Sequence, residues 1–306
     1  MTLLNKSSNG YVSTMVALWR TARVFGEKDG QKLLALCSPR VRPDQSHMGE
    51  TLSTWRTLGM FSESKGSLEL VPPFDTIDPN DIESLRTAVL DLLLRDENAP
   101  AFLTEDLSHA GPSHASDFVR VACWTLAQDP YEMSSMNRAA IEAAATEQGV
   151  TLYQGDGRWA SFQEWVYFTG LGVPTKFGLV ICPARAVRAK VREMTSLTDT
   201  VEMPLKDFLV QLAKALPVID GGRYREQIDA VRGANPAATG LGVSPALSLA
   251  LLQLGHEGEI ELSDRPGDVG KRIAFLGRGG EHVSAFSHIR RGRPVFSNAA
   301  VPEVQP

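Results

Sequence analysis

The clearest amphipathic pattern in the chain lies between Pro43 and Val71. Its apolar positions recur at i, i+4, i+7 and i+10: Met48, Leu52, Trp55 and Leu58. This spacing predicts a helix over Ser46–Leu58 with one buried stripe, ended by Gly59. From residue 61 to 71, alternating polar and apolar residues around Lys65-Gly66 predict a short β-ribbon. A helix followed by a ribbon is therefore the first structural unit that the pattern indicates.

Two further helices are predicted just upstream, over Val12–Phe25 and Asp29–Cys37. Three helices and a ribbon have the outline of a winged helix. A second, weaker copy is predicted over Ser244–Phe275: an apolar helix to Leu254, a strand at Ile260–Leu262 and a return strand over Arg272–Leu276. The segment between the copies reads as mainly helical.

The predicted fold is thus mostly α with small β-ribbons (α+β), with tandem winged-helix-like modules flanking a helical middle region. The predicted domains are 1–73, 74–203 and 204–306.

Composition places the chain among soluble globular proteins. Of 306 residues, 43% are apolar and 22% are charged. No apolar run approaches the ~20 residues of a membrane span, so we expect no membrane partner. The N-terminus is polar and lacks the apolar core of a signal peptide. Three scattered cysteines also fit a reducing compartment, and we expect the protein in the cytoplasm.

The charge is unevenly distributed, with a formal net value of −5. The segment from Asp75 to Asp106 contains nine acidic residues. The segment from Arg265 to the end contains seven lysines and arginines but only three acidic residues. A dedicated DNA-binding domain is usually basic. Any contact with double-stranded DNA must therefore come from local patches.

The first module contains one such patch. The helix 46–58 would turn a hydroxyl-rich face to a major groove, with cations before the helix and at the tip of the ribbon. The candidate DNA-binding residues here are Arg40, Arg42, Ser53, Thr54, Arg56, Thr57 and Lys65. A solvated surface or a protein-binding face is the competing interpretation.

Two more basic segments are candidates for phosphate contact. The predicted helix 184–194 places Arg185, Arg188 and Arg192 on one face, at i, i+3 and i+7. Near the C-terminus stand Arg290, Arg291 and Arg293. A solvated helix face, an acidic protein partner and a non-specific tail are the alternatives to DNA.

No catalytic, cofactor or metal motif appears. His109 and His114 lack a second histidine or cysteine at ligand spacing. The segment Gly170–Lys176 has the wrong spacing for a phosphate-binding loop, and we expect it to be a turn before a strand over Phe177–Cys182. We therefore expect no enzyme activity, no cofactor and no metal, although residues distant in sequence can converge in space.

Several segments together resemble a known family. They are Leu3-Leu4-Asn5, Ser8-Asn9-Gly10, Phe162 with Trp165, Gly170-Leu171-Gly172, and the run from Ala215 to Tyr224. This combination resembles the G proteins of bacterial dpd clusters, which insert 7-deazaguanine derivatives into DNA and restrict DNA lacking them. The resemblance implies a cytoplasmic anti-phage restriction system with helicase and nuclease partners.

The leading hypothesis is a non-enzymatic winged-helix subunit of such a system, which scaffolds partner proteins and contacts DNA without sequence preference. A winged-helix transcriptional regulator is one alternative, and it would need a more basic recognition helix. A bridging subunit of an SMC-type complex is another. A homodimer stays open.

Overall fold

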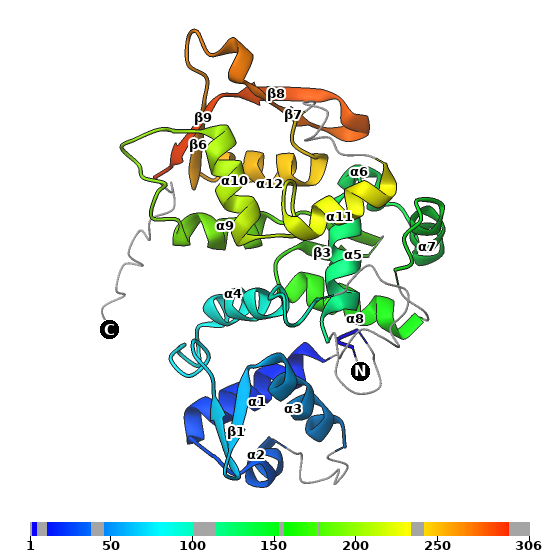
Figure 1. The fold of residues 1–306 in the computed structure, drawn as a ribbon, viewed down its shortest axis with the longest axis vertical. Coiled ribbons are helices and arrows are strands. Elements are labelled where there is room, and N and C mark those ends of the chain that lie inside the picture. The colour runs from blue at the N-terminus through cyan, green and yellow to red at the C-terminus, as the bar shows by residue number, and fades with distance from the viewer. Residues whose placement is uncertain are drawn as a thin grey trace, which may run out of the picture.

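The computed structural model describes residues 2–4, 11–37, 46–100, 114–152, 156–176, 178–233 and 242–293. They form an α+β protein of helices and small antiparallel sheets, which confirms the predicted class. Figure 1 shows the N-terminal helices at one end of the molecule and the C-terminal strands at the other.

The N-terminal region has the predicted order of elements. They are α1 (Val12–Phe25), α2 (Gly30–Cys37), α3 (Ser46–Leu58), β1 (Phe61–Ser64) and β2 (Ser67–Leu70). The two strands form an antiparallel hairpin that turns at Lys65-Gly66, where both residues have positive φ. Trp19 and Trp55 are fully buried, and the Trp19 indole donates to the Phe74 carbonyl at 3.0 Å. This bond fixes the chain that leaves the hairpin.

The middle region is mainly helical. It contains α4 (Ile82–Leu93), α5 (Ser116–Leu126), α6 (Pro130–Met133), α7 (Arg138–Glu147), α8 (Asp156–Phe168), β3 (Gly172–Thr175), β4 (Gly178–Ile181) and α9 (Ala184–Glu193). One detail differs from the prediction. Gly172–Thr175 is not a turn but the first strand of a hairpin, paired with Gly178–Ile181. Consequently the glycine-rich segment has no loop that could surround a phosphate.

The C-terminal region contains β5 (Met203–Pro204), α10 (Leu205–Ala215), α11 (Arg223–Arg232), α12 (Pro245–His256), β6 (Ile260–Ser263), β7 (Ile273–Leu276), β8 (His282–Phe286) and β9 (His288–Arg291). The predicted strand pairing here is wrong. β6 pairs with β9 in the three-stranded sheet β5-β9-β6, whereas β7 pairs with β8. A connection of five residues joins β7 to β8 as a hairpin, and β6 pairs instead with the later strand β9.

The buried core is continuous along the molecule. It runs from Leu3 in the first segment to Ile289 in β9. Trp55 of α3 and Trp165 of α8 are both fully buried, with ring centroids 5.4 Å apart. Their contact joins the N-terminal helices to the middle region across residue 73. The core thus does not stop at residue 73, where the first predicted domain ends. The division into three domains stays a prediction.

Candidate functional site

The exposed face of α3 and the hairpin beside it form the first candidate surface. Ser53, Arg56 and Thr57 line a hollow of about 590 Å³ that also reaches Ser62 and Arg95. Arg56 forms an ion pair with Glu63 of β1, and both side chains are more than a third exposed. This pair neutralises the one cation that the exposed face of α3 contributes.

The expected exposure of Thr54 is wrong. Its side chain is 7% exposed, and its hydroxyl donates to the Glu50 carbonyl at 3.0 Å. Thr51, about one turn earlier, is likewise buried. A buried hydroxyl that bonds four residues back is a common arrangement for threonine within a helix.

Lys65 is exposed at the turn of the hairpin, with φ of 52°. Within the described part of the chain, no carboxylate forms an ion pair with it. Arg40 and Arg42 lie outside the described residues. Among the seven candidate residues of the first module, Lys65 is thus a cation whose ammonium group can contact a phosphate.

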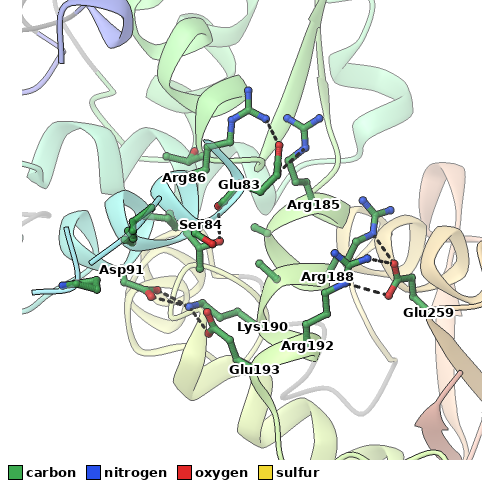
Figure 2. Close-up of a pocket in the computed structure, with 18 of the residues that line it drawn as sticks. Glu83, Ser84, Arg86, Asp91, Arg185, Arg188, Lys190, Arg192, Glu193 and Glu259 are labelled. Atoms are coloured by element: carbon green, nitrogen blue, oxygen red, sulfur yellow. Dashed lines mark hydrogen bonds and ion pairs between the residues drawn. The ribbon is translucent and has the colours of Figure 1, made fainter. Parts of the chain in front are cut away.

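A larger groove lies between α4 and α9, with a volume of about 990 Å³. Figure 2 shows its charged side chains, which come from both helices and from the chain after α12. Five acids line it (Glu83, Asp91, Glu193, Glu257 and Glu259), together with five cations (Arg86, Arg185, Arg188, Lys190 and Arg192). The groove as a whole is therefore close to neutral.

Two of the α9 arginines that the sequence singled out are held by acids near the end of α12. Arg188 forms an ion pair with Glu257, and its Nε lies 3.6 Å from Glu259. The Arg192 Nε donates to Glu259 at 3.3 Å. Burial alone would raise the pKa of Glu257, but the Gln253 amide and Arg188 hold it below its ordinary value. These pairs fasten α9 to the α12–β6 connection.

A buried lysine connects the two helices that form the groove. Lys190 has a side chain that is only 5% exposed, and its Nζ lies 2.6 Å from Asp91 of α4 and 2.9 Å from Glu193. Burial raises the pKa of Asp91, although the neighbouring Lys190 acts in the opposite direction. A buried amine is stable only when it is paired, so this bridge fixes the spacing of α4 and α9.

The three arginines near the C-terminus also have partners. Arg290 donates to Glu261 at 2.8 Å, and Arg293 lies 3.6 Å from Asp199. Arg291 instead donates to the carbonyls of Val191 in the last turn of α9, of the cap residue Met194, and of Leu197 just beyond the helix. Its guanidinium thus caps a helix whose last carbonyls have no partners within the helix.

A buried charge network lies under the Asp220–Tyr224 segment. Arg225 is 1% exposed; its Nε donates to Asp229 at 2.9 Å, and its Nη1 lies 3.0 Å from Asp220 and donates to the Leu126 carbonyl at 3.0 Å. Asp220 also accepts the Ser244 backbone N–H at 2.6 Å. The network ties α5, α11 and the start of α12 together, which gives this segment a structural role.

One serine, one histidine and one aspartate come together in the C-terminal sheet. The Ser287 hydroxyl lies 2.9 Å from His288 Nδ1, and Asp268 lies 3.9 Å from the same nitrogen. A catalytic relay needs the serine and the carboxylate on different ring nitrogens, and an accessible serine. Ser287 is 3% exposed, so this trio lacks the required geometry.

The described ranges contain no group of three histidine, cysteine, aspartate or glutamate side chains placed to bind a metal ion. Among the helices that the structure describes, none is both long and apolar enough to cross a membrane. His114 is described and belongs to no such group, and His109 lies outside the described residues.

Sequence reasoning identified the α9 arginines but missed the residues that neutralise them. Glu83 and Asp91 on α4 carried a usable signal, because residues eight positions apart lie on one face of a helix. Glu257 and Glu259 carried none, since they are about seventy residues away from their partners along the chain.

The comparison with known families gives one match. Residues 1–266 match the model of a family described as DpdG-like. No curated protein and no solved structure matches the chain.

Proposed function

Because the chain belongs to the DpdG-like family, we propose that it is a non-catalytic subunit of a dpd-type DNA modification and restriction system. In this proposal it scaffolds other proteins encoded in the same cluster, including helicase or nuclease subunits, and it acts in the cytoplasm. A homodimer within such an assembly is compatible with the proposal.

One observation carries this proposal: the cations best placed to bind phosphate are already paired within the protein. Arg188 and Arg192 hold Glu257 and Glu259, Arg290 holds Glu261, and Arg291 caps α9. Binding DNA there would require breaking these contacts and bringing phosphates close to the acids. A protein surface with interspersed charges of both signs suits this half of the molecule better.

DNA contact, where it occurs, belongs to the N-terminal module in this proposal. We interpret α1 to β2 as a winged-helix-like unit in which Lys65 at the hairpin turn, with Arg40 and Arg42, touches the phosphate backbone, and in which Arg56 joins them by exchanging Glu63 for a phosphate. Ser53 and Thr57 complete the exposed face. With so few cations, the contact would be weak and without sequence preference.

Co-purification tests the scaffolding role. The tagged protein is co-expressed with the other proteins of a dpd cluster, and the complexes are sized by light scattering. The proposal predicts a defined complex that survives moderate salt and nuclease treatment. Failure to retain any cluster protein, or retention that is lost on nuclease treatment, would overturn it.

A further inference from the structure

Two arginines flank one tyrosine at the Glu83 end of the groove between α4 and α9. The guanidinium carbons of Arg86 and Arg185 each lie 5.7 Å from the centre of the Tyr167 ring, and Arg86 also lies 5.4 Å from the Phe168 ring. A guanidinium held over an aromatic face keeps its charge while its N–H groups point outward. The three side chains form a small cationic cluster.

The backbone holds this cluster in place. Gly170 has φ of 76°, and a Cβ on it would lie 2.9 Å from the Arg185 Cβ. Its carbonyl also accepts the Ala186 N–H at 3.2 Å. The first turn of α9 therefore packs directly on the end of α8, which positions Arg185 beside Tyr167.

Glu83 occupies the space between the two arginines. Its carboxylate accepts from Arg86 Nη1 at 2.9 Å and lies 3.9 Å from Arg185 Nε, as Figure 2 shows. The Glu83 side chain is 66% exposed, and that of Arg185 is 41% exposed. Exposed ion pairs of this kind contribute little to stability and exchange readily. The acid on the other side of α9, Glu259, is by contrast only 13% exposed.

Arg86 keeps one donor unused. Its side chain is 16% exposed, and its Nε is buried without a hydrogen-bond partner among the described residues. A buried donor without a partner is costly, and an outside acceptor can pair with it only once the Arg86 side chain shifts, because the atom has no exposed surface. Glu83 from the preceding turn satisfies the outer nitrogen but leaves Nε unpaired.

We propose that Arg86, Tyr167 and Arg185 form a receptor for an aspartate or glutamate side chain in an extended segment of a partner protein, and that Glu83 occupies it as an internal competitor. This rests on the proposed scaffolding function and locates one of its docking sites. The partner carboxylate displaces Glu83 and reaches both guanidinium groups.

A protein carboxylate fits this groove better than a phosphate backbone. The groove carries Asp91, Glu193, Glu257 and Glu259 beyond the receptor, and these repel a continuous polyanion. Its walls also include small apolar positions at Ala88, Ala186 and Ala189, which suit a peptide lying between two helices. One or two acids on an otherwise neutral segment match this arrangement.

Fluorescence anisotropy at low ionic strength tests the receptor directly. The probe is a fluorescein-labelled peptide rich in alanine and serine that carries a single glutamate, and the same peptide with glutamine at that position is the control. The full-length protein is compared with Glu83→Gln, Arg185→Gln and Arg192→Gln. The last is the matched control, because it removes an arginine from the same helix face away from Glu83.

The glutamate peptide should bind and the glutamine peptide should not. Glu83→Gln should tighten binding about two- to fivefold, since it removes the competitor. Arg185→Gln should weaken binding about tenfold, while Arg192→Gln, which leaves Glu259 without that partner at the other end of the groove, should weaken it by no more than about twofold. Thermal melting of each variant confirms folding, and the gain expected from Glu83→Gln cannot arise from misfolding.

Three results would overturn the receptor. The first is equal binding of both peptides, and the second is an unchanged or weaker affinity of Glu83→Gln for the glutamate peptide. The third is displacement of the labelled peptide by oligothymidylate at a lower concentration than by unlabelled peptide, which would indicate a phosphate site. Each leaves the scaffolding function standing, because co-purification with cluster proteins does not depend on this one contact.

Discussion

Substitution of Arg291 tests whether the basic C-terminal residues are structural. Its Nη2 donates to the carbonyls of Met194 at 2.8 Å and Val191 at 2.9 Å, and its Nε donates to that of Leu197 at 3.1 Å. Arg291→Ala leaves these carbonyls at the end of α9 without that partner. It also removes a positive charge from the end of a helix dipole that favours it.

The expected cost follows from these contacts. A hydrogen bond from a charged donor contributes about 1.5–3 kcal/mol, and the three bonds share one half-buried guanidinium, so we expect a loss of about 3 kcal/mol in the free energy of unfolding. The entropy of unfolding is about 2.1 cal/mol/K per residue, and for a chain of this length the loss lowers Tm by about 5 °C. Arg291→Lys keeps the charge but not the planar donor set, and it should lose roughly half as much.

Thermal melting followed by circular dichroism measures these shifts. Arg290→Ala is the matched control, because Arg290 is the neighbouring residue and forms an exposed ion pair with Glu261 that contributes little to stability. Its Tm should fall by about 1 °C or less. If Arg291→Ala lowers Tm no further than Arg290→Ala does, the capping role assigned to Arg291 is refuted.

Three other substitutions have defined outcomes. Lys190→Met should lower the free energy of unfolding by about 2 kcal/mol in urea titrations, because Asp91 loses its 2.6 Å partner; no change would contradict the bridge between α4 and α9. Gly222→Ala should reduce the yield of folded protein, since its Cβ would lie 2.4 Å from the Pro217 carbonyl oxygen, and normal expression and melting would refute this close approach. Burial raises the pKa of Asp117, so the ionised carboxylate destabilises the folded protein at neutral pH. The wild type should therefore gain stability relative to Asp117→Asn as the pH falls through that raised pKa. If melting of the two proteins shows the opposite trend, ionisation stabilises the carboxyl instead.

Local patterns predicted the N-terminal helices and hairpin well. The stripe Met48, Leu52, Trp55 and Leu58 lies on α3, and Lys65-Gly66 forms the turn where it was expected. Both features depend on residues within one or two turns of each other. Periodicity and turn chemistry capture such features directly.

Features that depend on distant residues were not predictable in the same way. β6 pairs with β9 instead of with the nearer β7, which is paired with β8 across a connection of five residues. Trp55 of α3 packs on Trp165 of α8, which is far along the chain. A single sequence read by local pattern holds no signal for either contact.

The candidate site shows the same limit. The sequence predicted that Arg185, Arg188 and Arg192 share a face of one helix, and they do line one groove. It could not predict that Glu257 and Glu259 would meet two of them. Whether a basic helix binds a nucleic acid depends on which acids fold against it, and that is decided by tertiary structure.

The central claim is that the α9 arginines serve the protein's own structure and its protein partners, and that any DNA contact belongs to the N-terminal module. Anisotropy of labelled duplex DNA across a salt series tests this most directly. A variant with Arg185, Arg188 and Arg192 changed to glutamine is compared with one in which Arg40, Arg42, Arg56 and Lys65 are changed to alanine.

Each phosphate contact contributes about 0.9 to the slope of log K against log salt concentration. We predict that the α9 variant keeps the wild-type slope. In the N-terminal variant, the magnitude of the slope should fall by about 1 for each removed cation that contacts a phosphate. A slope that falls by about 3 in the α9 variant, and not in the N-terminal one, would contradict the account.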